Sequence, residues 1–162
     1  MTWHERQHEK RDILGLASVG FFFFLIGVIW IVNLNLNISQ EVIDFFNSFT
    51  RTGEIFPNVF LPYPVGNHQV VYTALAQFCL VFGLFQIVIL VLRFFLREPP
   101  NRIAGTFSGI VFWLGAGFVS NQLADGIIRW LGFVGWLIVL IGLALVVRSL
   151  LVLLFEVALR KG

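Results

Sequence analysis

Four apolar runs, each long enough to cross a bilayer as a helix, constrain this 162-residue chain more than any other feature of its sequence. They cover residues 13–32, 70–95, 103–122 and 130–155. A helix needs about 20 consecutive apolar residues to cross the hydrocarbon core of a bilayer, and each run reaches that length. The sequence therefore predicts an all-α integral membrane protein, folded as one membrane domain with a bundle of four transmembrane helices.

The composition fits a membrane protein better than a soluble one. Charged residues make up only 12% of the chain, whereas a soluble domain carries about 25%. The 11 Lys and Arg residues stand at the ends of apolar runs rather than in one patch, so we expect no nucleic-acid partner. The single cysteine, Cys79, excludes an internal disulfide and a thiolate metal cluster.

The positions of Lys and Arg predict how the chain is threaded. Only Arg51 and Arg129 lie in the segments 34–69 and 123–129. The other nine lie before the first run, around the link between the second and third runs, or towards the C-terminus: Arg6, Lys10, Arg11, Arg93, Arg97, Arg102, Arg148, Arg160 and Lys161. Positive residues favour the cytoplasmic side of a membrane. We therefore expect a multi-pass protein of the cell membrane with both termini in the cytoplasm.

The longest segment between runs, residues 34–69, is expected outside the cell. A short amphipathic helix is predicted over residues 39–49, because four apolar residues recur there at i, i+3, i+4 and i+7. These are Val42, Phe45, Phe46 and Phe49. We expect this helix to lie flat on the outer membrane surface, and the alternative is a lid over a cavity. Beyond it, Pro57-Asn58 indicates a two-stranded hairpin or an extended segment.

The segment His4-Glu5-Arg6-Gln7-His8 matches H-E-x-x-H, with which zinc peptidases hold their metal on a helix. A catalytic zinc needs three protein ligands, and the two histidines supply only two. Asp125, which precedes a glycine as in intramembrane zinc peptidases, is expected on the opposite side of the membrane. The acids Glu98 and Glu156 remain as third ligands. We predict that this segment is not catalytic and holds no metal and no cofactor. If a metal did bind, His4 and His8 would be its ligands.

Small residues predict a packing face on the third run. At about 100° per residue, four of them fall within about 60° of one line. They are Gly105, Gly109, Ala116 and Ser120. Small residues let two helices approach closely in lipid, so we expect this strip to pack inside the monomer. The alternative is a seam between two copies, whose facing surface comes from the fourth run: Gly132, Gly135 and Gly142.

Ionisable residues are scarce within the runs. No Asp, Glu, Lys or His lies near the middle of any run, which argues against proton-coupled transport, because such sites need a buried ionisable group. Arg148 is the exception to the apolar pattern, since it lies inside the inner end of the fourth run. We expect its side chain to reach the cytoplasmic headgroups. The alternative is pairing with a lipid phosphate or with an acid, Glu98 or Glu156.

These features predict a non-enzymatic membrane subunit that packs in the bilayer against partner proteins or against copies of itself. The alternative is a carrier or channel for an apolar or weakly polar solute or a lipid, with a cavity beneath the outer loop. The remaining alternative is a zinc-dependent membrane peptidase, which rests on His4 and His8 alone.

Overall fold

The computed structural model describes residues 3–49, 52–56, 59–66 and 68–161 of the chain. The first helix, α1, covers Trp3–Val32, and its side chains are described from Leu14 onward. The side chains of residues 50–62, 67 and 159–162 also lie outside the description.

Four helices are long and apolar enough to span a membrane, as the sequence predicts. They are α1, α3 (Gln69–Phe95), α4 (Pro100–Ala124) and α5 (Trp130–Lys161). By length and composition the chain is therefore a multi-pass membrane protein, built almost entirely from helices in its described part.

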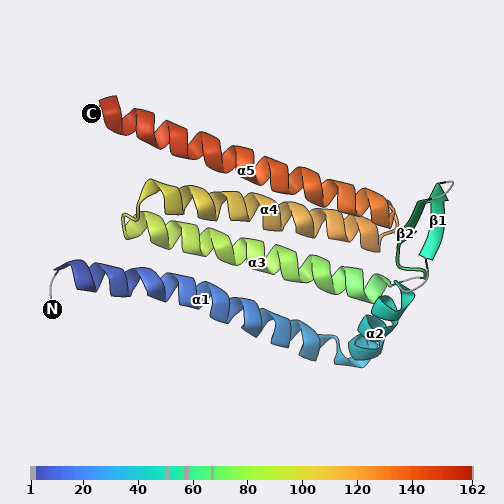
Figure 1. Ribbon diagram of the computed structural model, residues 1–162. Helices are drawn as coiled ribbons and strands as arrows, with labels where there is room; N and C mark the ends of the chain where they lie inside the picture. The colour runs from blue at the N-terminus through green and yellow to red at the C-terminus, as the bar shows by residue number, and fades with distance from the viewer. Residues whose placement is uncertain (1–2, 50–51, 57–58, 67, 162) are drawn as a thin grey trace.

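The four long helices lie in a row in the order α1, α3, α4, α5 (Figure 1). The central pair, α3 and α4, is packed most extensively, while α1 packs on α3 and α5 packs on α4. Buried residues make up 28% and 39% of the apolar stretches of α3 and α4, but only 6% of those of α1 and α5. The two flanking helices therefore turn most of their surface towards lipid or towards other proteins.

Glycines set the close approach of the central helices. A Cβ atom built on Gly117 of α4 would lie 2.7 Å from Cγ of Leu80 and 3.0 Å from its backbone nitrogen. A Cβ atom on Gly83 of α3 would lie 2.6 Å from Cδ2 of Leu114. Each helix thus offers a glycine to a leucine of the other, which is the small-residue contact that brings helices together in lipid.

Aromatic rings join α1 to α3. The ring of Phe21 stacks on Phe85 with centroids 3.8 Å apart, and Phe22 meets Phe78 edge to face at 5.1 Å. Aromatic pairs in such arrangements add about 0.5–1.5 kcal/mol beyond the area that they bury. These ring contacts attach the otherwise exposed α1 to the central pair.

The turn between α3 and α4 is set by two prolines. Pro100 is the first residue of α4, a position where a missing backbone N–H costs nothing. Arg97 takes a left-handed conformation with φ 50°, and the N–H of Glu98 donates to the carbonyl of Arg93 at 3.1 Å. This bond closes the C-terminus of α3. The short turn makes α3 and α4 antiparallel neighbours.

The segment between α1 and α3 contains a 3₁₀ turn, a helix and two strands. The turn covers Leu34–Leu36 and the helix, α2, covers Ile38–Ser48. The strands β1 (Thr52–Phe56) and β2 (Val59–Pro62) pair antiparallel, which is the first of the two arrangements that Pro57-Asn58 indicates.

The row of helices has two distinct ends. The α3–α4 turn, the start of α1 and the end of α5 lie at one end, which we name the turn end (Figure 1). The α4–α5 turn, α2 and the two strands lie at the other, which we name the loop end. The charged residues among the described side chains gather near these two ends, because the stretches between them are mostly apolar.

Candidate functional site

The loop end is closed by aromatic side chains from three helices. The ring of Phe45 on α2 lies 5.9 Å from the rings of both Tyr72 on α3 and Trp130 on α5. Phe49 lies 5.3 Å from Trp130. Phe46 stays 66% exposed. Phe45 and Phe49 of the predicted stripe therefore contact protein, and α2 caps the ends of α3 and α5.

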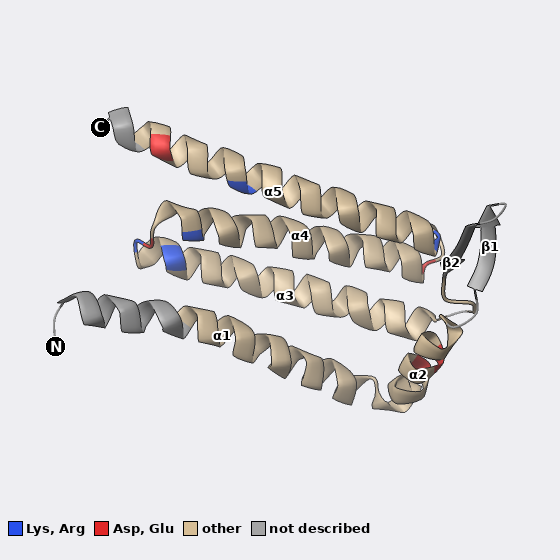
Figure 2. Cartoon of the chain, in the orientation of Figure 1, with Lys and Arg blue, Asp and Glu red and all other residues tan. Residues whose placement is uncertain are grey.

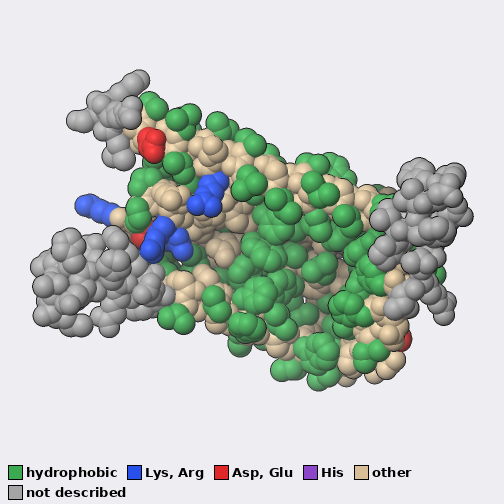
Figure 3. Space-filling model, viewed as in Figure 1, with side chains coloured by type: hydrophobic (Ala, Val, Ile, Leu, Met, Phe, Trp, Pro, Cys, Tyr) green, Lys and Arg blue, Asp and Glu red, His purple; other side chains and the backbone are tan. Residues whose placement is uncertain are grey.

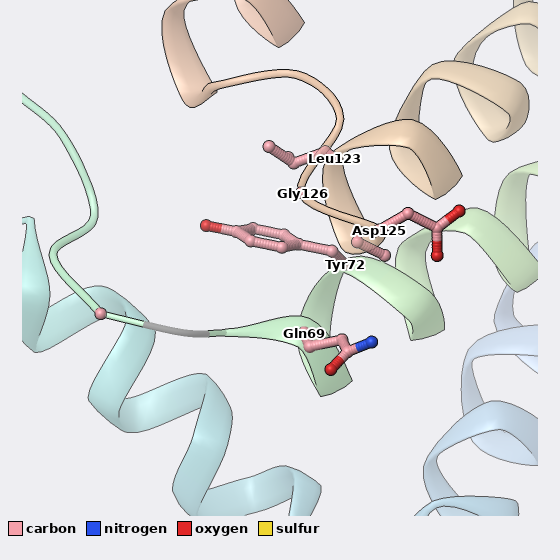
Figure 4. Close-up of a pocket in the computed structure, with 7 residues that line it drawn as sticks. Gln69, Tyr72, Leu123, Asp125 and Gly126 are labelled. Carbon is pink, nitrogen blue, oxygen red and sulfur yellow. The ribbon is translucent and has the colours of Figure 1, made fainter.

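An open pocket of about 630 Å³ lies beside this aromatic cap (Figure 4). Its lining comes from the start of α3 and the segment before it, and from the end of α4 and the α4–α5 turn: Gly66, Gln69, Tyr72, Leu123, Ala124, Asp125 and Gly126. The carboxylate of Asp125 points away from the hydroxyl of Tyr72 (Figure 4) and accepts a hydrogen bond from Asn121 at 3.0 Å. The pocket can hold a small molecule at the surface, but its polar groups do not converge on one reacting atom.

His68 is a buried polar residue next to this pocket. It directly precedes α3, is 6% exposed, and its ring lies 5.3 Å from that of Phe45. Neither ring nitrogen has a hydrogen-bond partner among the described residues. Buried polar atoms without partners are uncommon in proteins, which marks His68 as a point where a water or a ligand can bind. Nothing in its sequence surroundings distinguishes it, so sequence reasoning missed it.

The turn end carries a cluster of arginines contributed by three helices (Figures 2 and 3). A guanidinium nitrogen of Arg93, on α3, lies 3.6 Å from the carboxylate of Glu98 and donates to the carbonyl of Arg102, on α4, at 3.1 Å. Arg148, on α5, donates to the side-chain carbonyl of Asn101 at 3.2 Å. These contacts link α3, α4 and α5 at one level. A concentration of guanidinium groups at that level can bind anions, phosphate in particular.

No family model, no curated protein and no solved structure matches this chain. Function therefore rests on the chemistry of the two ends and on the faces of the helices between them.

Arg148 pairs with neither Glu98 nor Glu156, the two acids that the sequence suggested as its partners. Its described partner is the amide of Asn101, while Glu98 pairs with Arg93 instead. Glu156 is exposed and lies about two turns farther along α5. The contact between Arg148 and Asn101 joins residues 47 positions apart, so no local pattern could have indicated it.

The strip of small residues on α4 is packed over only part of its length. Ala116 and Ser120 are 3% and 1% exposed, as a packing face requires. A Cβ atom on Gly105 or Gly109, however, would meet nothing within 4 Å. The expectation that the whole strip packs inside the monomer is therefore corrected for these two glycines, because no described atom of a neighbouring helix lies within 4 Å of either position.

The tightest glycine contacts of α4 lie on either side of Ala116. Gly115 faces Leu140 of α5, and Gly117 faces Leu80 of α3. Sequence reasoning missed both, although the Gly-Ala-Gly run at residues 115–117 places small residues on three sides of α4.

The histidines of H-E-x-x-H lie in the first turns of α1, and the side chains of His4 and His8 are outside the described part of the chain. Among the described side chains, no group of three or more His, Cys, Asp or Glu residues could hold a metal ion. The proposed third ligand Glu98 is bound to Arg93.

Proposed function

We propose that this protein is a non-enzymatic subunit of the cell membrane, which packs through α5 against a transmembrane helix of another protein or of a second copy. The supporting observation is a glycine face on α5. Three glycines of that helix are exposed, and a Cβ atom on each would meet nothing within 4 Å: Gly132, Gly135 and Gly142.

This glycine face points away from the rest of the chain. At about 100° per residue, the three glycines fall within about 80° of one another. The side of α5 that packs on the rest of the chain carries Phe133 and Leu140, which are 3% and 8% exposed. The glycine face is centred about 130° around the helix from those two side chains. A helix that docks there would not displace α4.

Glycines on a lipid-facing surface need a physical reason. Each glycine inside a helix destabilises that helix by about 1 kcal/mol relative to alanine. Lipid tails do not offset this loss, because they pack against any apolar side chain equally well. A second helix can offset it, since glycines allow two backbones to approach closely and to gain van der Waals contact. Close contact with another helix is therefore the best account of the glycine face.

The oligomeric state tests this proposal. Replacing Gly135 and Gly142 together by Leu places two branched side chains into the contact. Overpacking costs about 1–3 kcal/mol, so the dissociation constant of the complex should rise roughly 5- to 150-fold. Light scattering in mild detergent over a range of protein concentrations measures this shift. The substitution Ile141→Leu serves as the control and should change nothing, because this position is 50% exposed and lies about 130° around the helix from the glycine face.

Two results together would overturn the glycine face as a contact. The first is a wild-type protein that is monomeric at every concentration. The second is an unchanged set of co-purifying membrane proteins when Gly135 and Gly142 are both Leu.

We also propose that the turn end faces the cytoplasm. Arg93 lies in the last turn of α3, Arg97 in the α3–α4 turn and Arg102 in the first turn of α4, and Arg148 contacts Asn101 beside them. Arg129 directly precedes α5, at the loop end. Figure 2 shows basic residues gathered at the turn end. The excess of positive charge favours the cytoplasmic side, and it agrees with the basic residues near both ends of the chain.

Thiol labelling in intact cells tests this orientation. In a background with Cys79→Ala, an impermeant maleimide should modify Ser39→Cys on α2 but not Arg97→Cys in the α3–α4 turn. Both positions are exposed, so accessibility within the protein does not bias the comparison. Permeabilised cells supply the control, because both variants should then react. Labelling of Arg97→Cys alone in intact cells would invert the topology.

A carrier is the second candidate, and the pocket at the loop end favours it. Below the pocket, however, the buried side chains of α3 and α4 are mostly apolar, among them Cys79 and Val119, and the hydroxyl of the buried Ser120 donates to the carbonyl of Ala116. A solute could pass only if α3 and α4 separated, and their reciprocal glycine contacts oppose that. The subunit role is therefore the better proposal.

A further inference from the structure

The turn end holds more positive charge than its acids balance. Around the α3–α4 turn, four arginines face one carboxylate, which gives four minus one, or a net charge of +3: Arg93, Arg97, Arg102 and Arg148, with Glu98. The Glu98 side chain is 5% exposed and is already committed to Arg93. In the described part of the chain, Arg102 and Arg148 have no acidic partner.

Arg102 and Arg148 lie near the turn end of the small-residue strip on α4. Around α4, Gly115 faces α5 and Gly117 faces α3, in directions about 200° apart, so the side chain of Ala116 points midway between them, into the wide angle between α3 and α5 on that face of the row. Gly105 and Gly109 point within about 20° of the same direction, and Arg102 within about 40°. Both glycines therefore lie in that angle, with Arg102 about one turn farther towards the turn end.

Among the described residues, the strip is open at the turn end and closed farther in. A Cβ atom on Gly105 or Gly109 would meet nothing within 4 Å, whereas Ala116 is 3% exposed. The reason is the course of α5, which packs on α4 near the loop end and diverges from it towards the C-terminus (Figure 1). Arg148 still reaches Asn101 across the opening. The open stretch from Arg102 to Gly109 is about 10 Å long.

We propose that this opening binds an anionic phospholipid. The phosphate lies between the guanidinium groups of Arg102 and Arg148, and one acyl chain runs along Gly105 and Gly109 towards Ala116. Guanidinium groups donate paired hydrogen bonds to phosphate oxygens. Basic pockets between transmembrane helices on the cytoplasmic side are suited to anionic headgroups.

Two features favour a lipid over a free anion or a docked helix. The arginines would suffice for a soluble phosphate, but an apolar strip that begins about one turn from Arg102 matches a ligand with a charged head and an apolar tail. A helix in the same place would bring its own apolar side chains against Arg148, whose charge would then lose solvent with only the amide of Asn101 as a described partner. Orientation of the chain alone requires positive charge at this end, but not its convergence from three helices.

Native mass spectrometry tests the proposal with the intact protein in mild detergent. Phosphatidylglycerol and phosphatidylcholine with identical acyl chains are added in equal amounts. Each arginine near a headgroup contributes about 1 kcal/mol, or about a fivefold preference. We therefore expect a preference for phosphatidylglycerol of roughly 25-fold, which should be lost in the double variant Arg102→Gln/Arg148→Gln. Arg129→Gln, which removes one charge at the loop end, should keep it.

A second variant separates binding from folding. Gly109→Leu keeps every charge but fills the strip, and it should lower the amount of bound phosphatidylglycerol at least fivefold without lowering the melting temperature measured in phosphatidylcholine. Arg148→Lys should retain part of the preference, because it keeps the charge but loses the paired donors.

Three results would overturn the proposal. The first is equal binding of the two lipids by the wild-type protein. The second is an equal loss of preference in Arg129→Gln, which would mean that total charge decides. The third is displacement of the lipid by millimolar inorganic phosphate, which would make the opening a site for a soluble anion.

Discussion

Replacing Gly117 by Leu should separate α3 from α4 and lower the stability of the folded protein by about 1–3 kcal/mol or more. The reason is that the added side chain would meet backbone as well as side chain. A Cβ atom there lies 3.0 Å from the backbone nitrogen of Leu80, which can move only if the whole of α3 moves. Because α1 packs on α3 and α5 packs on α4, separation of the two central helices should destabilise the whole bundle.

Thermal unfolding in detergent, followed by tryptophan fluorescence and by circular dichroism, measures the effect of Gly117→Leu. Gly109→Leu is the matched control, because it makes the same change on the same helix, where a Cβ atom meets nothing within 4 Å. Its melting temperature should stay close to that of the wild type. Equal melting temperatures for the two variants would mean that α3 and α4 do not approach each other at Gly117.

Replacing Glu98 by Ala should also be strongly destabilising. Removing one partner of a buried ion pair costs about 3–5 kcal/mol, because the remaining charge stays buried without compensation. We expect a value near the lower limit, since the side chain of Arg93 is 17% exposed and keeps its hydrogen bond to the carbonyl of Arg102. Unfolding measured under the same detergent conditions gives the magnitude.

Two further variants show whether the pair itself is responsible. Replacing Arg93 and Glu98 together by Leu should recover most of the loss, because no unpaired charge remains. Glu156→Ala, at an exposed acid of α5, should change stability by less than about 0.5 kcal/mol. A loss for Glu98→Ala as small as that for Glu156→Ala would mean that the ion pair does not hold the α3–α4 turn.

The spans could be predicted from sequence because hydrophobicity alone decides them. The second run was expected at residues 70–95, and α3 covers Gln69–Phe95. The third was expected at 103–122, and α4 covers Pro100–Ala124. The difference arises because an apolar run ends at the first polar residues, whereas a helix continues for as long as its backbone bonds are made.

The contacts between helices were harder to predict, because they depend on where a neighbour lies. Gly105, Gly109 and Ala116 share one face of α4, yet only Ala116 is covered, since α5 diverges from α4 along its length. Periodicity identifies a face but not its occupant. The same limit applies to Phe45, whose apolar stripe suits a membrane surface and the ends of α3 and α5 equally well.

The order of helices in the row also bears on how the protein is assembled. Because α1, α3, α4 and α5 follow one another in space as they do along the chain, each helix that leaves the translocation machinery finds its neighbour already in place. The short α3–α4 turn makes that pair the natural nucleus, since closing a short loop costs little entropy. Loss of α5 would leave the nucleus intact, whereas loss of α4 would leave α5 without the helix on which it docks. We therefore expect a chain that ends after α4 to keep the packed α3–α4 pair, and a chain that ends before α4 to lose it.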